Sequence, residues 1–86
     1  MKMEQQVSGL DGVVGSLSEL KEDATVPRNV RNHIQNIINN LKNGVELSIK
    51  VNKALNDLGE ISNDVNLQSY TRTQIWNIMS VLEKMH

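Results

Sequence analysis

The sequence predicts an all-α fold, an antiparallel four-helix bundle built from two copies of one helix hairpin. First, residues 23–41 return in altered form as residues 64–82, and a period of about 40 residues is typical of stacked helical units. Second, four segments carry apolar residues at helical spacing on one side, and their connections are so short that successive helices must run antiparallel. The chain is therefore expected to form a single domain, residues 1–86, with repeat one at about 3–42 and repeat two at about 44–85.

The first helix is expected over residues 4–21, where apolar residues recur on one face. That face is formed by Met3, Val7, Leu10, Val13, Val14, Leu17 and Leu20. The opposite face carries small residues, which we call the small-residue strip. The strip consists of Ser8, Gly9, Gly12, Gly15 and Ser16. Each glycine inside a helix lowers its stability by roughly 0.8–1 kcal/mol relative to alanine, so we expect contacts elsewhere to offset this loss.

The second helix is expected over residues 26–42, with Thr25 as its cap and Pro27 in its first turn. Its apolar and polar faces separate cleanly. The apolar face holds Val26, Val30, Ile34, Ile37, Ile38 and Leu41, and the polar face holds Asn29, Asn32, Asn36, Asn39 and Asn40. Asn43 and Gly44 then predict a left-handed end to the helix and an immediate reversal of the chain.

The third and fourth helices are expected over residues 45–61 and 67–84, the latter capped by Asn66. The third buries Leu47, Val51, Ala54, Leu55, Leu58 and Ile61, and the fourth buries Leu67, Thr71, Ile75, Ile78, Leu82 and Met85, with Tyr70, Met79 and Val81 at its margins. Two apolar residues of the third helix, Val45 and Ile49, fall off its buried face. Trp76 lies outside the apolar stripe of the fourth helix.

Composition favours an aliphatic core and gives no long-range field. The chain has no cysteine and no phenylalanine, and its net charge is −1. Neither nucleic acid nor an anionic membrane is favoured by this charge, and no cysteine means no disulfide framework and no thiolate metal site. With no signal peptide and no apolar span in the sequence, we expect a cytoplasmic protein that does not enter a membrane.

The order of elements resembles a known repeat. Each unit has an apolar helix, a turn with an aspartate and a second apolar helix that opens with an arginine, which resembles a HEAT repeat, a helix pair of protein-binding solenoids. The segments LSELKEDATVPRNVR (17–31) and RTQIWNIMSVLE (72–83) are also similar to the small archaeal proteins grouped as uncharacterised protein family 0147, over nearly the whole chain. This resemblance implies a four-helix fold, an archaeal cytoplasm and no established activity.

Two aspartate and arginine pairs recur at the same spacing, Asp23 with Arg31 and Asp64 with Arg72. They could bind ligands. We favour a structural interpretation, because a carboxylate in a turn can accept main-chain amides and pair with an arginine of the following helix. A feature repeated with the fold usually serves the fold.

Basic residues near one end of repeat one raise the alternative of a nucleic-acid-associated accessory protein. Lys21, Arg28, Arg31 and His33 could meet a phosphate backbone. No aromatic residue accompanies them, and nucleic-acid binders usually concentrate more basic charge. We therefore expect no nucleic-acid partner in the first instance.

We expect no enzymatic activity, no cofactor and no metal. The two histidines, His33 and His86, are far apart in sequence, and the sequence shows neither metal-ligand spacing nor a nucleophile beside a base.

The remaining features predict a protein-interaction or scaffold module that associates with itself. The candidate partner surface consists of Gly9, Gly12, Gly15, Ile49 and Trp76. Two repeats bury less apolar area than a longer solenoid would, which favours stacking on a second copy. A homodimer or a higher homo-oligomer is expected, with a further protein partner that the sequence does not identify.

Overall fold

The structure is a computed structural model that describes the backbone of residues 2–85 and the side chains of residues 10–85. It contains four helices, α1 (Lys2–Glu22), α2 (Arg28–Lys42), α3 (Leu47–Ile61) and α4 (Ser69–Glu83). Each predicted helix is present, and no strand occurs in residues 2–85. The all-α class with four packed helices is therefore confirmed.

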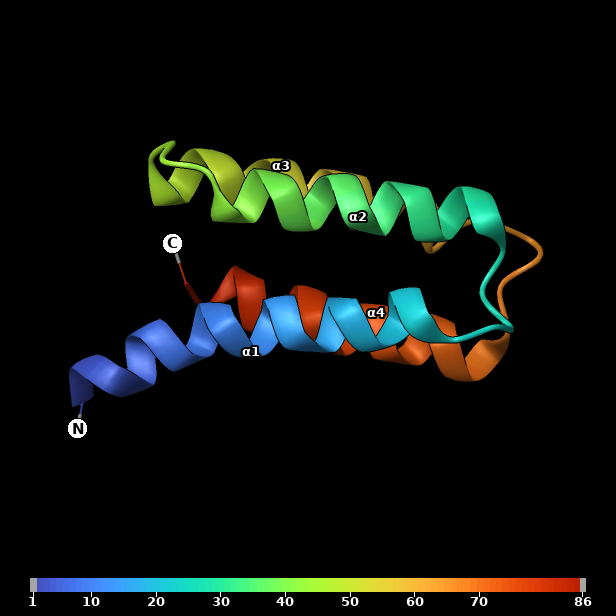
Figure 1. Cartoon of the computed structure of the whole chain (residues 1–86), viewed down its shortest axis with the longest axis horizontal. Helices are drawn as coiled ribbons and strands as arrows, with labels where there is room; N and C mark the ends of the chain where they lie inside the picture. The colour runs from blue at the N-terminus through green and yellow to red at the C-terminus, as the bar shows by residue number, and fades with distance from the viewer. Residues whose placement is uncertain (1, 86) are drawn as a thin grey trace.

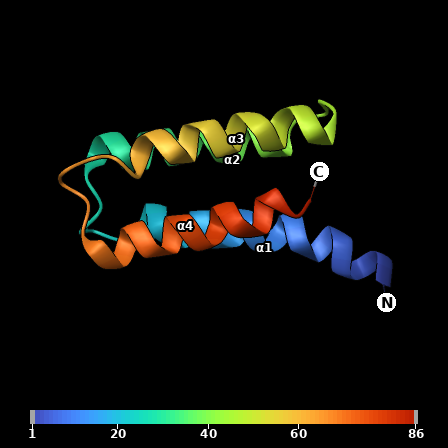
Figure 2. The ribbon, with the colours of Figure 1, turned by 180° about the vertical axis from the view of Figure 1, so that it is seen from behind.

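The helices form two layers, α1 beside α4 and α2 beside α3 (Figure 1). Each helix packs against two others, α1 and α3 both against α2 and α4, so α1 and α3 lie diagonally across the bundle. The α1–α2 and α3–α4 turns lie together at one end, as both ribbon views show (Figures 1 and 2). The α2–α3 connection lies at the other end.

The core is aliphatic and draws on all four helices. Its buried members are Val13, Leu17, Leu20, Val26, Val30, Ile34, Ile37, Ile38, Leu41, Val51, Ala54, Leu58, Ile61, Leu67, Ile75, Ile78 and Leu82, with Leu10, Val14, Leu55, Met79 and Met85 partly buried against them. The apolar faces predicted from helical spacing are thus largely confirmed. The side chains of Met3 and Val7 lie outside the described residues.

Three apolar residues were placed wrongly by the periodicity argument. Leu47 was expected in the core but is 41% exposed, because it opens α3 at the end of the bundle, where residues 42–49 are all exposed. Tyr70 and Val81, expected at the margin of the α4 stripe, are 67% and 43% exposed. Helical spacing gives the direction of a side chain but does not show where the neighbouring helix ends.

The predicted caps are also wrong. Pro27 and Gln68 occupy the N-cap positions of α2 and α4, and neither side chain makes a capping bond. Thr25 instead donates its hydroxyl to Asp23 Oδ1 at 2.7 Å. The helices start later than predicted because the aspartate, two residues earlier than the predicted cap, organises the turn.

The two hairpin turns use the same bonds. In the first, the N–H of Val26 donates to the main-chain carbonyl of Asp23 at 3.1 Å; in the second, the N–H of Leu67 donates to that of Asp64 at 3.2 Å. The carboxylates accept as well, from the N–H of the residue two positions later in each turn, at 2.9 and 2.8 Å. The sequence repeat therefore corresponds to a repeated turn.

The α2–α3 connection is not the predicted left-handed turn. No described residue has a positive φ, Gly44 included, and Asn43 is extended, with φ −82° and ψ 173°. The side-chain oxygen of Asn43 accepts the N–H of Val45 at 2.8 Å, and its main-chain carbonyl accepts Lys50 Nζ at 3.1 Å. A side-chain acceptor thus replaces the left-handed glycine as the means of reversing the chain.

No helix in residues 2–85 is both long enough and apolar enough to cross a membrane.

Candidate functional site

The carboxylates of Asp23 and Asp64 accept hydrogen bonds from main-chain N–H groups of their own turns. The pKa of the Asp23 carboxyl lies below its ordinary value because the main-chain N–H of Thr25, and then its hydroxyl, donate to the charged form. The pKa of Asp64 is lowered first by the main-chain N–H of Asn66 and next by the side-chain amide of Asn29. Asn29 belongs to α2, so its 3.1 Å bond to Asp64 Oδ2 joins the two hairpins at the end where both turns lie.

Arg72 ties α4 to the turn before it, but not through the carboxylate. Its Nε donates to the main-chain carbonyl of Ser62 at 2.8 Å, and its Nη2 donates to that of Asp64 at 2.9 Å. Both bonds are partly buried. The predicted structural function of Arg72 thus has a geometry that fits it, with carbonyl oxygens as the acceptors in place of the expected ion pair.

Arg31, the counterpart of Arg72 in the first repeat, has a different environment. Its Nε is buried and has no hydrogen-bond partner among the described residues. A shallow hollow at the surface is lined by Lys21, Arg28, Arg31, Asn32 and Gln35. Three cations and no carboxylate line this hollow, and Lys21 Nζ donates to Gln35 Oε1 at 2.6 Å. The two aspartate and arginine pairs therefore have the same spacing in sequence, but their arginines have different surroundings in the structure.

The described part of the small-residue strip lies on the outside of α1. Gly12, Gly15 and Ser16 are exposed, and a Cβ placed on either glycine would meet no other atom within 4 Å. Ser16 also lines a shallow cleft between α1 and α4, which Tyr70 borders from the other helix. Gly9 is part of α1, but its surroundings lie outside the described residues.

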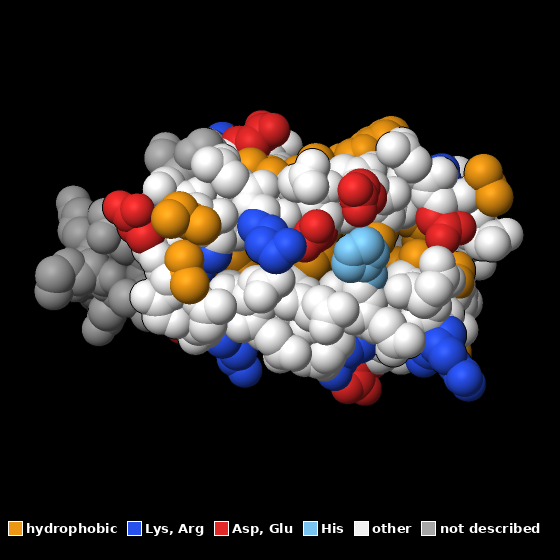
Figure 3. Space-filling view, turned by 90° about the horizontal axis from the view of Figure 1, so that it is seen from above, with side chains coloured by type: hydrophobic (Ala, Val, Ile, Leu, Met, Phe, Trp, Pro, Cys, Tyr) orange, Lys and Arg blue, Asp and Glu red, His pale blue; other side chains and the backbone are white. Residues whose placement is uncertain are grey.

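The predicted partner residues do not form one surface. Ile49 is 56% exposed and lies on α3, the helix diagonal to α1. It is accompanied by exposed Val45 and Leu47, and Figure 3 shows hydrophobic side chains gathered where α2 passes into α3. Trp76 is 54% exposed and lies on α4, which packs against both α1 and α3. The small-residue strip and the residues around Ile49 are thus separate surfaces.

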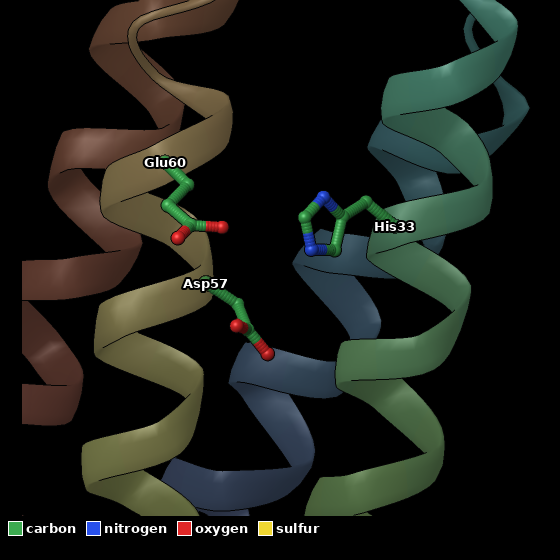
Figure 4. Close-up of side chains that lie close together, drawn as sticks. All are labelled: His33, Asp57 and Glu60. Atoms are coloured by element: carbon green, nitrogen blue, oxygen red, sulfur yellow. The ribbon is translucent and has the colours of Figure 1, made fainter.

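A cluster that the sequence did not reveal lies on the face formed by α2 and α3. His33 of α2 and Asp57 and Glu60 of α3 bring one ligand atom each to within 4.8 Å of one another. Figure 3 shows the histidine between acidic side chains on this face, and Figure 4 shows the imidazole directed toward both carboxylates. His33 therefore lies apart from the basic residues with which its place in the sequence had grouped it.

Two signals could have revealed the cluster. Asp57 and Glu60 are three residues apart and thus on one side of α3, and the predicted reversal between α2 and α3 places those helices side by side. What the sequence did not supply was the axial register of the two helices, which decides whether His33 lies level with this pair.

The comparisons with known proteins agree on one family. The model of an uncharacterised protein family, UPF0147, matches residues 1–85. A UPF0147 protein of Methanocaldococcus jannaschii is 44% identical over 77 residues, covering 88% of this chain and 83% of that protein. Another, from Archaeoglobus fulgidus, is 40% identical over 77 residues, covering 90% of this chain and 88% of the relative.

A solved structure shares the fold. The crystal structure of a UPF0147 protein from Thermoplasma acidophilum aligns with a TM-score of 0.89 at 32% identity, covering 94% of this chain and 96% of the other. The resemblance to the archaeal family predicted from residues 17–31 and 72–83 is confirmed.

The two arginines should differ in their effect on stability. Arg72→Ala should lower the free energy of unfolding by about 1–3 kcal/mol, because two partly buried carbonyls lose a charged donor. Arg31→Ala should lower it by less, since its Nε has no partner among the described residues. Urea denaturation of both variants measures the difference. An equal or larger loss for Arg31→Ala would contradict the assignment.

Acid should remove the contribution of Asp64. Its folded-state pKa is lowered, so its stabilisation is present above the ordinary value of about 3.9 and is lost as the pH falls through the folded-state value. The difference in thermal midpoint between the parent and Asp64→Ala should therefore be largest near neutral pH and shrink below about pH 4. Asn66→Ala, which keeps the main-chain donor, should retain the pH dependence of the parent. A difference that is the same at pH 3 and pH 7 would exclude this account.

Proposed function

We propose that this chain, which belongs to uncharacterised protein family UPF0147, is a non-catalytic protein-interaction module that associates with a second copy of itself. The association uses the outer face of α1 and the adjoining edge of α4. The observation that carries the proposal is the open, side-chain-free surface at Gly12 and Gly15. The proposed module acts in the cytoplasm, and the proposal includes neither a cofactor nor a reaction.

Nothing in the described monomer requires these glycines. Both have non-positive φ, and both have free space where a Cβ would lie, so neither backbone conformation nor close packing within the chain favours glycine. Each nevertheless destabilises α1 by roughly 0.8–1 kcal/mol relative to alanine. Close approach of a helix from another molecule offsets this loss, because backbones that come close together gain dispersion contacts along their length.

The neighbouring residues on α4 supply the complementary half of such an interface. Tyr70 and Val81 are exposed, and Tyr70 lines the same cleft as Ser16. Gly12 lies one helical turn before Ser16 and so faces the same way. In a two-fold dimer each surface contacts its own copy, so the apolar side chains of one protomer can cover the small-residue strip of the other.

The two helix pairs are interpreted as HEAT-like repeats. The recurring turn bonds of Asp23 and Asp64 support this, because each turn sets its helix pair with the same acceptors. Repeat proteins of this kind bury apolar surface by stacking units, and two units leave stacking surface for a further copy.

Gly12→Gln should weaken self-association and leave the fold intact. Sedimentation equilibrium of the parent should show a dimer at high concentration, and the variant should dissociate at least about tenfold more readily because its longer side chain occupies the path of the second helix. Gly44→Gln is the matched control, since Gly44 also has open space and a non-positive φ but lies at the opposite end of α2 from the hairpin turns. It should leave the dimer unchanged.

Two results would contradict the proposed dimer surface. A parent that is monomeric at high concentration, together with a Gly12→Gln variant that simply melts higher, would show that the strip is a solvated face with improved helix propensity. A loss of dimer in both glycine variants would also contradict the assignment of the surface.

A second candidate function, a nucleic-acid-associated accessory protein, rests on the hollow lined by Lys21, Arg28 and Arg31. These three cations line it without a carboxylate. An anion such as a backbone phosphate fits this set of donors. The small number of cations and the net charge of −1 place it behind self-association.

Salt dependence tests this second candidate. Anisotropy of a labelled single-stranded oligonucleotide should show affinity falling with salt at a log–log slope of about −2 if three cations contact phosphates. Arg28→Gln should reduce the slope by about 0.7. Lys53→Gln, which removes a cation from α3, should leave the slope unchanged. Binding that is absent at low salt, or a slope insensitive to Arg28→Gln, would eliminate the candidate.

A further inference from the structure

The cluster of His33, Asp57 and Glu60 brings together three electron-pair donors from two helices. The imidazole comes from α2 and both carboxylates come from consecutive turns of α3 (Figure 4). Their ligand atoms lie within 4.8 Å of one another. One ring nitrogen and two carboxylate oxygens are thus aimed at a common space between the helices.

These three side chains do not bond to one another. No hydrogen bond or ion pair links His33 to either acid among the described residues, although the ligand atoms lie within 4.8 Å of one another. Asp57 has a cationic neighbour on its own helix, Lys53, whose Nζ lies 3.7 Å from Asp57 Oδ2. The Lys53 side chain is 58% exposed and the pair is four residues apart on one helix, so this is a weak surface ion pair.

The position of the cluster brings two negative charges close together. The Asp57 side chain is only 13% exposed, His33 is half-buried and Glu60 is exposed. Two carboxylates held one helical turn apart repel each other, and partial burial reduces the screening by water. A divalent cation placed between them and the imidazole would remove this repulsion.

We propose that His33, Asp57 and Glu60 form a Zn²⁺ site that bridges α2 and α3. Imidazole and carboxylate are both ligands of zinc, and an imidazole selects against Mg²⁺ and Ca²⁺, which take oxygen ligands. Zinc bonds of about 2.0–2.2 Å require ligand atoms to be no more than about 4 Å apart, so the side chains close in by rotation. Three protein ligands leave the fourth position to water.

The bridge links the two repeats. His33 belongs to the first hairpin and the two carboxylates belong to the second, so the ion ties the hairpins along the α2–α3 face. Because the folded chain alone brings the three ligands together, zinc should stabilise the fold by mass action.

Zinc titration of the full chain by calorimetry, in buffer free of chelators, should show one ion bound per chain. Free Zn²⁺ at about 100 times its Kd should raise the thermal midpoint by about 10–20 °C. Co²⁺ in place of Zn²⁺ should give the visible absorption of a four-coordinate ion. His33→Ala should weaken binding at least about tenfold and remove the rise in midpoint, since even losing a group that only orients a ligand costs that much.

Two variants sharpen the test. His86→Ala, which removes the other histidine of the chain, should leave zinc binding unchanged. Lys53→Gln should tighten binding about two- to fivefold, because it removes a cation that competes for Asp57. Binding that survives His33→Ala, that is lost in His86→Ala, or that is absent in the parent would overturn the proposal. None of these readouts depends on self-association, so the outcome is independent of the proposed dimer.

Discussion

The architecture depends on one constraint. Each helix has a single aliphatic face, and the connections are too short to let successive helices separate. Residues such as Leu17, Ile34, Leu58 and Ile75 are completely buried, one from each helix. Burying these faces is worth roughly 25 cal/mol for each Å² of apolar surface removed from water. Four helices that reverse direction at every connection can satisfy all four faces only by enclosing a common core. The layers, the diagonal placement of α1 and α3, and the exposure of the polar faces follow from that closure.

Much of this could be predicted from sequence because helical spacing reports directly on which side of a helix is buried. The α2 face was identified completely, whereas Leu47 was misplaced because it lies beyond the end of its neighbours. The turns were harder. Several side chains could cap a helix, and the sequence favoured Thr25, but the aspartate two residues earlier takes the main-chain donors. The His33 cluster escaped for a related reason, since contacts between helices depend on axial register, which no periodicity within one helix encodes.

The equivalent arginines of the two hairpins have different surroundings. Arg72 is held by two main-chain carbonyls, and the equivalent Arg31 lies in a hollow shared with Lys21 and Arg28. In the second turn, Arg72 donates to two main-chain carbonyls; in the first, Thr25 donates twice to Asp23. No hydrogen bond from Arg31 to the first turn occurs among the described residues, so that turn does not use its arginine as the second turn uses Arg72.

The location of the aromatic residues has an optical consequence. The chain has one tryptophan, one tyrosine and no phenylalanine, and both Trp76 and Tyr70 are more than half exposed. Near-ultraviolet circular dichroism and intrinsic fluorescence therefore report on the surface of α4 and are almost blind to the aliphatic interior. A state that kept its helices but lost fixed packing in the interior would be seen by these signals only through its effect on the surface of α4. Methyl resonances of the buried isoleucine, leucine and valine residues are the signals that would distinguish an ordered interior from a fluid one.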